Sequence, residues 1–189
     1  IEVIEPHLNF GFTTRGCIRK CPFCVVPRKE GTIRAVNDLL GLWDRKSKEI
    51  ILFDNNILAL PEHFSLICKE ARHFKIKLDF NQGLDHRLLT PEIVDLLKTI
   101  SHYEYRFAFD HPNYINSVEK AINLLQSKGI NRCNWYVLVG FDTTFKQDLD
   151  RLKYLRERGQ RAWVQRYRSR RKLGKEYTVL ANWVNAHNI

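Results

Sequence analysis

The chain has 189 residues, of which 44% are hydrophobic and 28% are charged, a balance typical of one globular domain spanning residues 1–189. It is too apolar for a disordered chain, and no apolar run approaches the roughly 20 residues that cross a bilayer. Five cysteines are an odd number, and three of them lie between Cys17 and Cys24. This pattern does not suit a secreted disulfide framework and indicates a reducing, cytoplasmic compartment. The absence of methionine indicates that a longer chain was trimmed at Ile1.

The expected elements alternate along the chain. Short runs rich in β-branched and aromatic residues occur at 7–14, 49–54, 75–81, 103–110, 134–140 and 162–167. Between them lie stretches with helical apolar spacing, such as Val118, Ile122 and Leu125. This alternation predicts an α/β fold with a mainly parallel sheet, either a layered sheet or an incomplete barrel with the helices outside. Residues just after each strand are then the functional candidates, because the connecting loops gather at that edge.

Several helix boundaries are marked by the sequence. Thr90-Pro91-Glu92 combines a capping hydroxyl, a proline at the first helical position and an acid in the first turn. Leu60-Pro61-Glu62 and His111-Pro112 mark two further helix starts. A final helix is expected over 177–187, with Leu180 and Val184 packed against the sheet.

Cys17, Cys21 and Cys24 form a C-x3-C-x2-C motif on the loop after the first strand. Three thiolates on one short loop can converge on a soft metal centre. Reduced cysteines that only fill space are one interpretation, and a structural zinc site with a fourth ligand from His7, Cys68 or Cys133 is another. An iron–sulfur cluster held by three cysteines is the favoured interpretation, because it leaves one iron open for chemistry.

The motif and its context resemble the radical SAM superfamily. Phe23 supplies the aromatic of C-x3-C-x-aromatic-C, and the segments RGCIRKCPFCVVPRKEG, ILFDNNIL, KLDFNQGLDHRLL and NWVN resemble a subgroup of small radical SAM proteins. The resemblance covers nearly the whole chain and implies a partial (β/α)6 barrel as a single core domain. It also implies an enzyme that binds one [4Fe–4S] cluster and S-adenosylmethionine (SAM). Reductive cleavage of SAM would give a 5′-deoxyadenosyl radical that abstracts hydrogen from an unidentified substrate.

The same resemblance assigns roles to residues near the cluster. Cys17, Cys21 and Cys24 would be the ligands, and the backbone at Phe23 would lie against adenine. Asp54, Asn55 and Asn56 occupy the position of a Gly-Gly-Glu-type segment that takes the SAM amino group. This chain departs from that pattern, and the alternative is a turn that ends the strand. An electron donor such as ferredoxin or flavodoxin is implied as a partner.

Residues after the later strands complete the expected site. Asn81 and Gln82 would bind ribose hydroxyls or substrate, and Arg87 would pair with the SAM carboxylate, unless it forms a local ion pair with Asp85. Asp110 would lie near ribose or substrate, or would instead cap the next helix.

The last two strands supply the remaining candidates. Gly140 would let adenine approach the backbone, or would only form a turn. Gln165, Tyr167 and Arg168, on or just after the last strand, are candidate substrate groups.

The net charge of +10 is concentrated in one part of the sequence. Residues 151–175 contain eleven Lys/Arg and a single acid, Glu157. With Trp163, Tyr167 and Tyr177 nearby, this segment would suit the phosphates and unpaired bases of a nucleic acid, although a solvated helix face and loop is the simpler interpretation. The competing function is therefore a metal- or cluster-stabilised RNA-binding module, or a radical SAM enzyme that modifies RNA.

Overall fold

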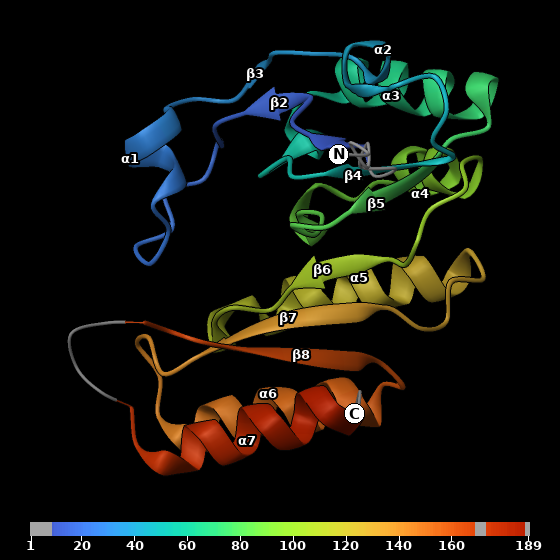
Figure 1. Cartoon of the computed structure of the whole chain (residues 1–189). Coiled ribbons are helices and arrows are strands. Elements are labelled where there is room, and N and C mark those ends of the chain that lie inside the picture. Colours follow the sequence, from blue (N-terminus) through green and yellow to red (C-terminus); the bar gives the residue numbers. More distant parts are fainter. Residues whose placement is uncertain (1–8, 169–172, 188–189) are drawn as a thin grey trace, which may run out of the picture. The chain divides into compact units, whose positions relative to one another are not determined.

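The computed structural model of the chain describes residues 9–168 and 173–187 (Figure 1). Its contacts divide the chain into two compact units, each described by itself below. Unit 1 comprises Ile1–Leu84 and Leu88–Glu104, and unit 2 comprises Asp85–Arg87 and Tyr105–Ile189. That the two units together form the single domain expected over residues 1–189 stays a prediction.

Unit 1 contains a parallel sheet covered by helices. Its strands are β1 (Asn9–Gly11), β4 (Glu49–Leu52) and β5 (Lys77–Phe80), in the order β1-β4-β5. Ile50 and Leu52 of β4 are buried, as are Phe64, Ile67 and Cys68 of helix α3. The helices are α1 (Val26–Glu30), α2 (Leu39–Leu42), α3 (Pro61–Phe74) and α4 (Pro91–Lys98). Two short 3-10 turns occur at Ile57–Ala59 (η1) and His86–Leu88 (η2). His86 and Arg87 of η2 belong to unit 2.

The expected helix starts of unit 1 are confirmed. Thr90 accepts a hydrogen bond from the backbone N–H of Ile93, and Pro91 occupies the first turn of α4. Pro61 and Glu62 begin α3 as predicted. An antiparallel pair was not foreseen: β2 (Thr14–Arg15) pairs with β3 (Arg34–Ala35).

Unit 2 contains a second parallel sheet, β6 (Arg106–Ala108), β7 (Asn134–Val139) and β8 (Arg161–Arg166), in that order. Alternation divides its residues between two faces. One face carries the buried Phe107, Trp135, Val137, Ala162 and Val164. The helices are α5 (Ile115–Ser127), α6 (Phe145–Glu157) and α7 (Lys175–His187), preceded by the 3-10 turn η3 (Pro112–Tyr114).

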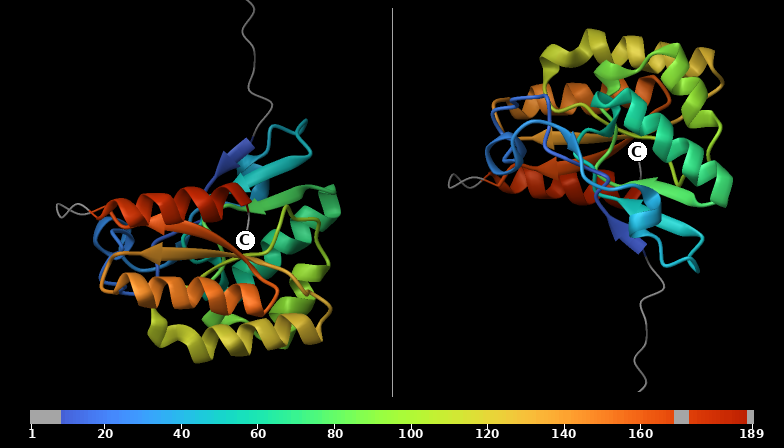
Figure 2. Two further views of the ribbon diagram at one scale, coloured as in Figure 1. Left: turned by 90° about the horizontal axis from the view of Figure 1, so that it is seen from below. Right: turned by 90° about the horizontal axis from the view of Figure 1, so that it is seen from above.

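The final helix, α7, covers the open edge of β8. Figure 2 shows the two elements side by side, and Leu180 and Val184 of the helix are buried as predicted. The Asn185 side chain accepts a hydrogen bond from the Val164 backbone N–H at 2.7 Å and donates one to the Val164 carbonyl at 3.1 Å. One side-chain amide therefore satisfies backbone groups that an edge strand would otherwise expose.

The sequence-based α/β assignment is confirmed at the level of its elements. All six expected strand runs contain a strand in parallel pairing. The first five strands are shorter than their runs, whereas β8 has the expected length and begins one residue earlier than predicted. Residues 7 and 8 lie outside the described residues. The strand pairings among the described residues close no barrel. His111-Pro112 begins a 3-10 turn, not directly the α-helix. Within the described part of the chain, no helix has the length and apolar character needed to span a membrane.

Candidate functional site

The three clustered cysteines lie on the loop between β2 and α1. Cys17, Cys21 and Cys24 are not disulfide-bonded, and each is partly exposed. The Cys24 N–H donates to the Cys21 carbonyl, which makes a tight turn between the last two cysteines. The Cys17 sulfur accepts weak hydrogen bonds from the Arg19 N–H at 3.3 Å and from the Asn56 side-chain amide at 3.5 Å.

The two ends of this cysteine loop, residues 16–31, are held together. The β2–β3 pair lies just outside them, and the Cys17 N–H donates to the Gly31 carbonyl at 3.2 Å. Gly16 has φ +85°, and a Cβ there would lie 2.2 Å from the Thr32 carbonyl oxygen. Only glycine fits this crossing of two backbone segments, because the obstructing atom belongs to the main chain.

Three cysteine sulfurs are suitable ligands for a soft metal centre, but they do not lie in a metal-binding arrangement in this structure. Among residues 9–168 and 173–187, no group of three or more His, Cys, Asp or Glu side chains is placed to hold a metal ion. Metal binding would have to draw the three sulfurs together within a loop whose ends are already fixed. The zinc interpretation gains no fourth ligand from Cys68 or Cys133: both are buried, and burial raises the pKa of each thiol to about 12. His7 lies outside the described residues.

Asp54 forms hydrogen bonds with Thr13 and Thr14, which precede the cysteine loop. Its Oδ1 accepts hydrogen bonds from the backbone N–H and the hydroxyl of both Thr13 and Thr14. Its Oδ2 is buried with no hydrogen-bond partner among the described residues. Burial raises the pKa of Asp54, although the hydrogen bonds from Thr14 and Thr13 oppose that rise. This carboxyl group therefore has a structural role on one oxygen and a vacant acceptor on the other.

Asn55 and Asn56 both reach toward the cysteine loop. The Asn55 amide donates to Glu30 Oε2 at 3.0 Å, and the Asn56 amide donates to the Cys17 sulfur. The segment predicted to take the SAM amino group thus contacts the loop of the predicted cluster ligands. Glu30, at the end of α1, was not foreseen, and its one sequence signal is that it is the sole acid among six Lys/Arg in residues 15–34.

The residues after β5 form a tight turn. The Asn81 N–H donates to the Leu52 carbonyl, which extends the β4–β5 pairing by one step, and the Gly83 N–H closes the turn on Phe80. Gln82 is exposed at its tip. The role predicted for Asn81 and Gln82 in binding ribose or substrate stays a prediction.

In unit 2, Asp85 and Arg87 form the local ion pair that was the alternative to SAM binding. Arg87 Nε lies 2.7 Å from Asp85 Oδ1, and Nη2 lies 3.2 Å from Oδ2. The guanidinium also lies over the Tyr114 ring, 5.0 Å from its centroid. Because the Ser117 hydroxyl donates to the Tyr114 carbonyl, it must accept from His86 Nε2 at 3.0 Å, which fixes the proton on that nitrogen. The loop is therefore ordered by its own contacts.

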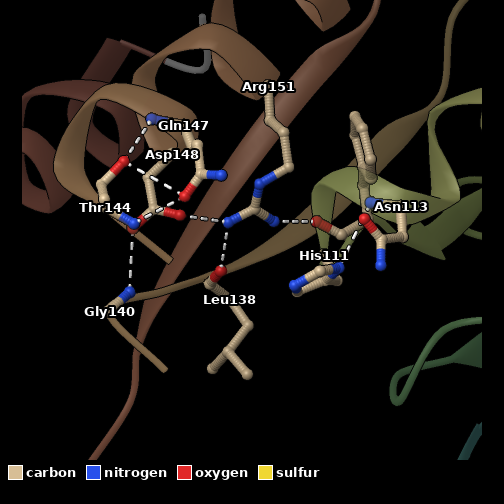
Figure 3. Close-up of polar contacts among 9 residues, drawn as sticks. His111, Asn113, Leu138, Gly140, Thr144, Gln147, Asp148 and Arg151 are labelled. Carbon is tan, nitrogen blue, oxygen red and sulfur yellow. Dashed lines mark hydrogen bonds and ion pairs between the residues drawn. The ribbon is translucent and has the colours of Figure 1, made fainter. Parts of the chain in front are cut away.

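Asp110 follows β6 in a partly buried position. Desolvation raises its pKa to about 6, while the positive charges of Arg151 and Arg87 and a backbone hydrogen bond from Leu138 oppose the rise. The alternative role as a helix cap is wrong, because His111 caps the following turn by accepting from the Asn113 N–H (Figure 3). Asp110 is thus a carboxyl group with an unusual proton affinity at the carboxyl end of a strand, a position where catalytic groups are common.

Arg151 and Asp148 of α6 tie the ends of β6 and β7 together (Figure 3). The guanidinium donates to the carbonyls of Phe109 and Leu138 and pairs with Asp148. Asp148 Oδ2 accepts the Gly140 N–H at 2.9 Å. Sequence patterning missed this buried pair.

Gly140 turns the chain after β7 with φ +74°. The Leu173 side chain occupies the space where a Cβ on Gly140 would lie, with its Cδ2 at 2.5 Å. The turn that was the alternative role of Gly140 is therefore present, and the contact with adenine stays a prediction.

The sheet of unit 2 presents a polar second face. Register and alternation place Gln165 opposite Leu138, on the face that also bears Tyr136 and Trp163, and Tyr167 continues that face after β8. Gln165 and Arg168 are exposed, and the Tyr167 ring contacts Phe141 edge-on at 4.8 Å. Gln165 and Tyr167 thus lie on the same face of one sheet.

Three arginines among the described residues of the basic segment 151–175 are engaged in local contacts. Arg151 is buried in its ion pair, and Arg158 pairs with Glu119 and donates to Asn123. Arg166 donates to the Thr178 hydroxyl on α7. Arg170, Arg171 and Lys172 lie outside the described residues.

Two groups of predicted residues are brought together, each within one unit. The cysteine loop meets Asn55 and Asn56 in unit 1, whereas Asp110 lies in the field of Arg87 and Arg151 in unit 2. No protein-family model matches the chain, and no curated protein matches it significantly.

Proposed function

We propose that this chain is a radical SAM enzyme that binds one [4Fe–4S] cluster through Cys17, Cys21 and Cys24. The observation that carries the proposal is the placement of three partly exposed cysteines, none of them disulfide-bonded, on one loop near the start of a unit built on a parallel sheet. Five basic residues on or beside this loop would stabilise thiolates and offset the negative charge of a cluster: Arg15, Arg19, Lys20, Arg28 and Lys29.

The six parallel strands would belong to one partial (β/α)6 barrel, with residues 1–189 as a single core domain. Two three-stranded parallel sheets with helices between their strands supply the elements that such a barrel requires. An experimental structure in which the two sheets belong to separate domains would refute the partial barrel.

Within the proposed enzyme, each group of residues would have a binding role. The Asp54 Oδ2 acceptor would take the SAM amino group together with the neighbouring Asn55 and Asn56, since an amine needs acceptor oxygens. Asp110 would hold or move a proton near ribose or substrate. The bound cluster, reduced by one electron, supplies the chemistry that cleaves SAM to methionine and a 5′-deoxyadenosyl radical. That electron would come from a donor such as ferredoxin or flavodoxin in the cytoplasm.

The proposal is tested by anaerobic reconstitution with iron and sulfide. About four irons and four sulfides per chain are expected. Dithionite and SAM should then release 5′-deoxyadenosine and methionine. Replacing Cys17, Cys21 or Cys24 with alanine should abolish the release, whereas Cys68→Ala should leave it largely intact because Cys68 is buried in the core of unit 1.

Three results would contradict the proposal. Zinc without iron or sulfide would indicate a structural site, and a fully loaded cluster that releases no 5′-deoxyadenosine would indicate a binding protein. Equal loss in Cys68→Ala and in the loop variants would refute the ligand assignment. RNA binding with a steep salt dependence, combined with zinc alone, would favour the nucleic-acid-binding module.

A further inference from the structure

Glu30 lies where the two ends of the cysteine loop meet. Its Oε2 accepts the Gly16 N–H at 2.9 Å and the Asn55 side-chain amide at 3.0 Å. Its Oε1 lies 2.8 Å from Arg15 Nη2. The side chain is only 15% exposed, so these contacts are shielded from water on most sides. One carboxylate thus joins the start of the loop, the end of α1 and the segment after β4.

The surrounding backbone supports the same closure. The Cys17 N–H donates to the Gly31 carbonyl at 3.2 Å, and Arg34 Nη1 donates to the Glu30 carbonyl at 2.8 Å. Thus the first cysteine and the residue before it are both hydrogen-bonded to the far end of the loop. The distance between the loop ends is therefore fixed before any ligand binds.

We infer that Glu30 is a positioning residue for the three-cysteine site: its carboxylate holds the loop ends together and so lowers the entropy cost of bringing Cys17, Cys21 and Cys24 together around a metal. The inference rests on the cysteines binding a metal, but it does not depend on SAM cleavage. The physical reason is that ordering ligands during binding costs conformational entropy, which a closed loop has already lost. Groups that orient metal ligands without touching the metal typically change metal affinity about 10–100-fold when they are removed.

Glu30 could instead act only through its negative charge, and a pair of variants distinguishes this explanation from loop closure. Glu30→Ala and Glu30→Gln remove the same negative charge, but only glutamine keeps an oxygen that can accept the Gly16 N–H. If Glu30 acted only through its charge, the two variants would behave alike. If it acts by closing the loop, Glu30→Gln should retain much of the affinity that Glu30→Ala loses.

The test is an anaerobic titration of the metal-free chain with Co²⁺, followed through the thiolate-to-cobalt absorption. Glu30→Ala should bind Co²⁺ about 10–100-fold more weakly than the unaltered chain, and Glu30→Gln should lie between them. Glu157→Ala, a matched loss of one exposed carboxylate at the end of α6, should bind like the unaltered chain. Equal affinity in Glu30→Ala and the unaltered chain would overturn the inference, as would equal loss in Glu30→Ala and Glu30→Gln.

Hydrogen exchange of the metal-free chain provides an independent measurement. The Gly16 and Cys17 amides should be protected in the unaltered chain and in Glu30→Gln, and Gly16 should exchange faster in Glu30→Ala. Rapid exchange of both amides in the unaltered chain would overturn the inference even if Glu30→Ala does not fold. If the unaltered chain binds neither Co²⁺ nor an iron–sulfur cluster, the proposed function fails, and exchange alone then decides whether Glu30 closes the loop.

Discussion

Asp148 and Arg151 form an ion pair within one turn of α6 that is almost completely buried, with 0% and 2% of their side chains exposed. The pair is also bonded to the main chain of both neighbouring strands, through the carbonyls of Phe109 and Leu138 and through the Gly140 N–H. A charged pair in such a position holds the ends of β6 and β7 in register with α6. These strand ends also carry Asp110, so the pair supports the polar part of unit 2.

Removing one partner of this pair should strongly destabilise the fold. Arg151→Met would leave the Asp148 carboxylate buried and unpaired, and breaking a buried pair in this way costs about 3–5 kcal/mol. The double variant with Asp148→Asn should lose less than the single Arg151→Met variant, because no uncompensated charge remains. Urea unfolding measures the free energy of unfolding of both variants. Lys146→Ala is the control, because it removes an exposed ion pair with Asp150 that contributes at most about 0.5 kcal/mol. A change of under about 1 kcal/mol for Arg151→Met would show that the pair is not structural.

Asp110 should make the free energy of unfolding depend on pH near 6. Its pKa is raised from 3.8 to about 6, so the folded chain holds this proton more tightly than the unfolded chain does. The stabilising contribution is therefore complete below about pH 3.8 and is lost as the pH rises through 6. The loss amounts to on the order of 3 kcal/mol between these limits.

The variant Asp110→Asn isolates this contribution. Between pH 4 and 7 the unaltered chain should lose stability relative to Asp110→Asn, as measured by urea unfolding at each pH. Asp44→Asn is the matched control: hydrogen bonds from Ser47 and Lys46 lower the pKa of Asp44 to about 2, so its pH dependence lies below this window. Parallel stability curves for Asp110→Asn and the unaltered chain would contradict the raised pKa.

Gly16 should tolerate no side chain, whereas Gly129 should tolerate one at modest cost. Both have positive φ, +85° and +82°, so an alanine at either position pays a backbone penalty of about 1 kcal/mol. A Cβ on Gly16 would in addition overlap the Thr32 carbonyl, and one on Gly129 would meet nothing within 4 Å. Gly16→Ala should therefore lose clearly more stability than Gly129→Ala, together with metal binding by the cysteine loop. Equal losses in thermal unfolding would mean that the crossing at Gly16 can relax.

Elements with strong local patterns were predictable from the sequence, and tertiary contacts were not. The strand over 134–140 was predictable from its β-branched and aromatic composition. The helix beginning at Thr90-Pro91 was predictable from its capping residues. The β2–β3 pair contains only two residues in each strand, which is too short to show any alternation. Its existence depends on Gly16 and on contacts that close the cysteine loop.

The candidate site divides in the same way. Spacing and residue type identified Cys17, Cys21 and Cys24, but the contacts of Glu30 span 14 and 25 residues and leave no periodic trace. Asp148 and Arg151 lie three and six residues after Phe145 on α6, beside its apolar stripe, and this spacing was the available signal for burial. It was missed because charged residues on a helix are usually solvated, and the carbonyls that solvate Arg151 come from strands elsewhere in the chain.

Asp54→Ala should destabilise unit 1 more than Asp54→Asn does. In the alanine variant the buried N–H groups and hydroxyls of Thr13 and Thr14 lose their acceptor, and each unsatisfied group costs about 1–3 kcal/mol. Asparagine keeps one oxygen for these donors. Urea unfolding should therefore rank the unaltered chain above Asp54→Asn and Asp54→Asn above Asp54→Ala. The reverse order of the two variants would show that the carboxylate charge, not the acceptor, holds the strand.

The five cysteines should separate into two classes by their reactivity. In the folded, metal-free chain, iodoacetamide should modify Cys17, Cys21 and Cys24, which are partly exposed. Cys68 and Cys133 should resist, because both are buried and their pKa values of about 12 leave roughly one thiol in 10⁴ ionised at pH 8. Mass spectrometry of the alkylated peptides measures the five rates.

Metal loading and unfolding extend this experiment. Anaerobic reconstitution with iron and sulfide should protect the three loop cysteines together, since each would become a ligand of the same centre. Urea should expose Cys68 and Cys133 in the transition that unfolds the chain, because both thiols belong to the cores of their units. Protection of only one or two loop cysteines would contradict a three-thiolate ligand set, and early modification of Cys68 or Cys133 would contradict their burial.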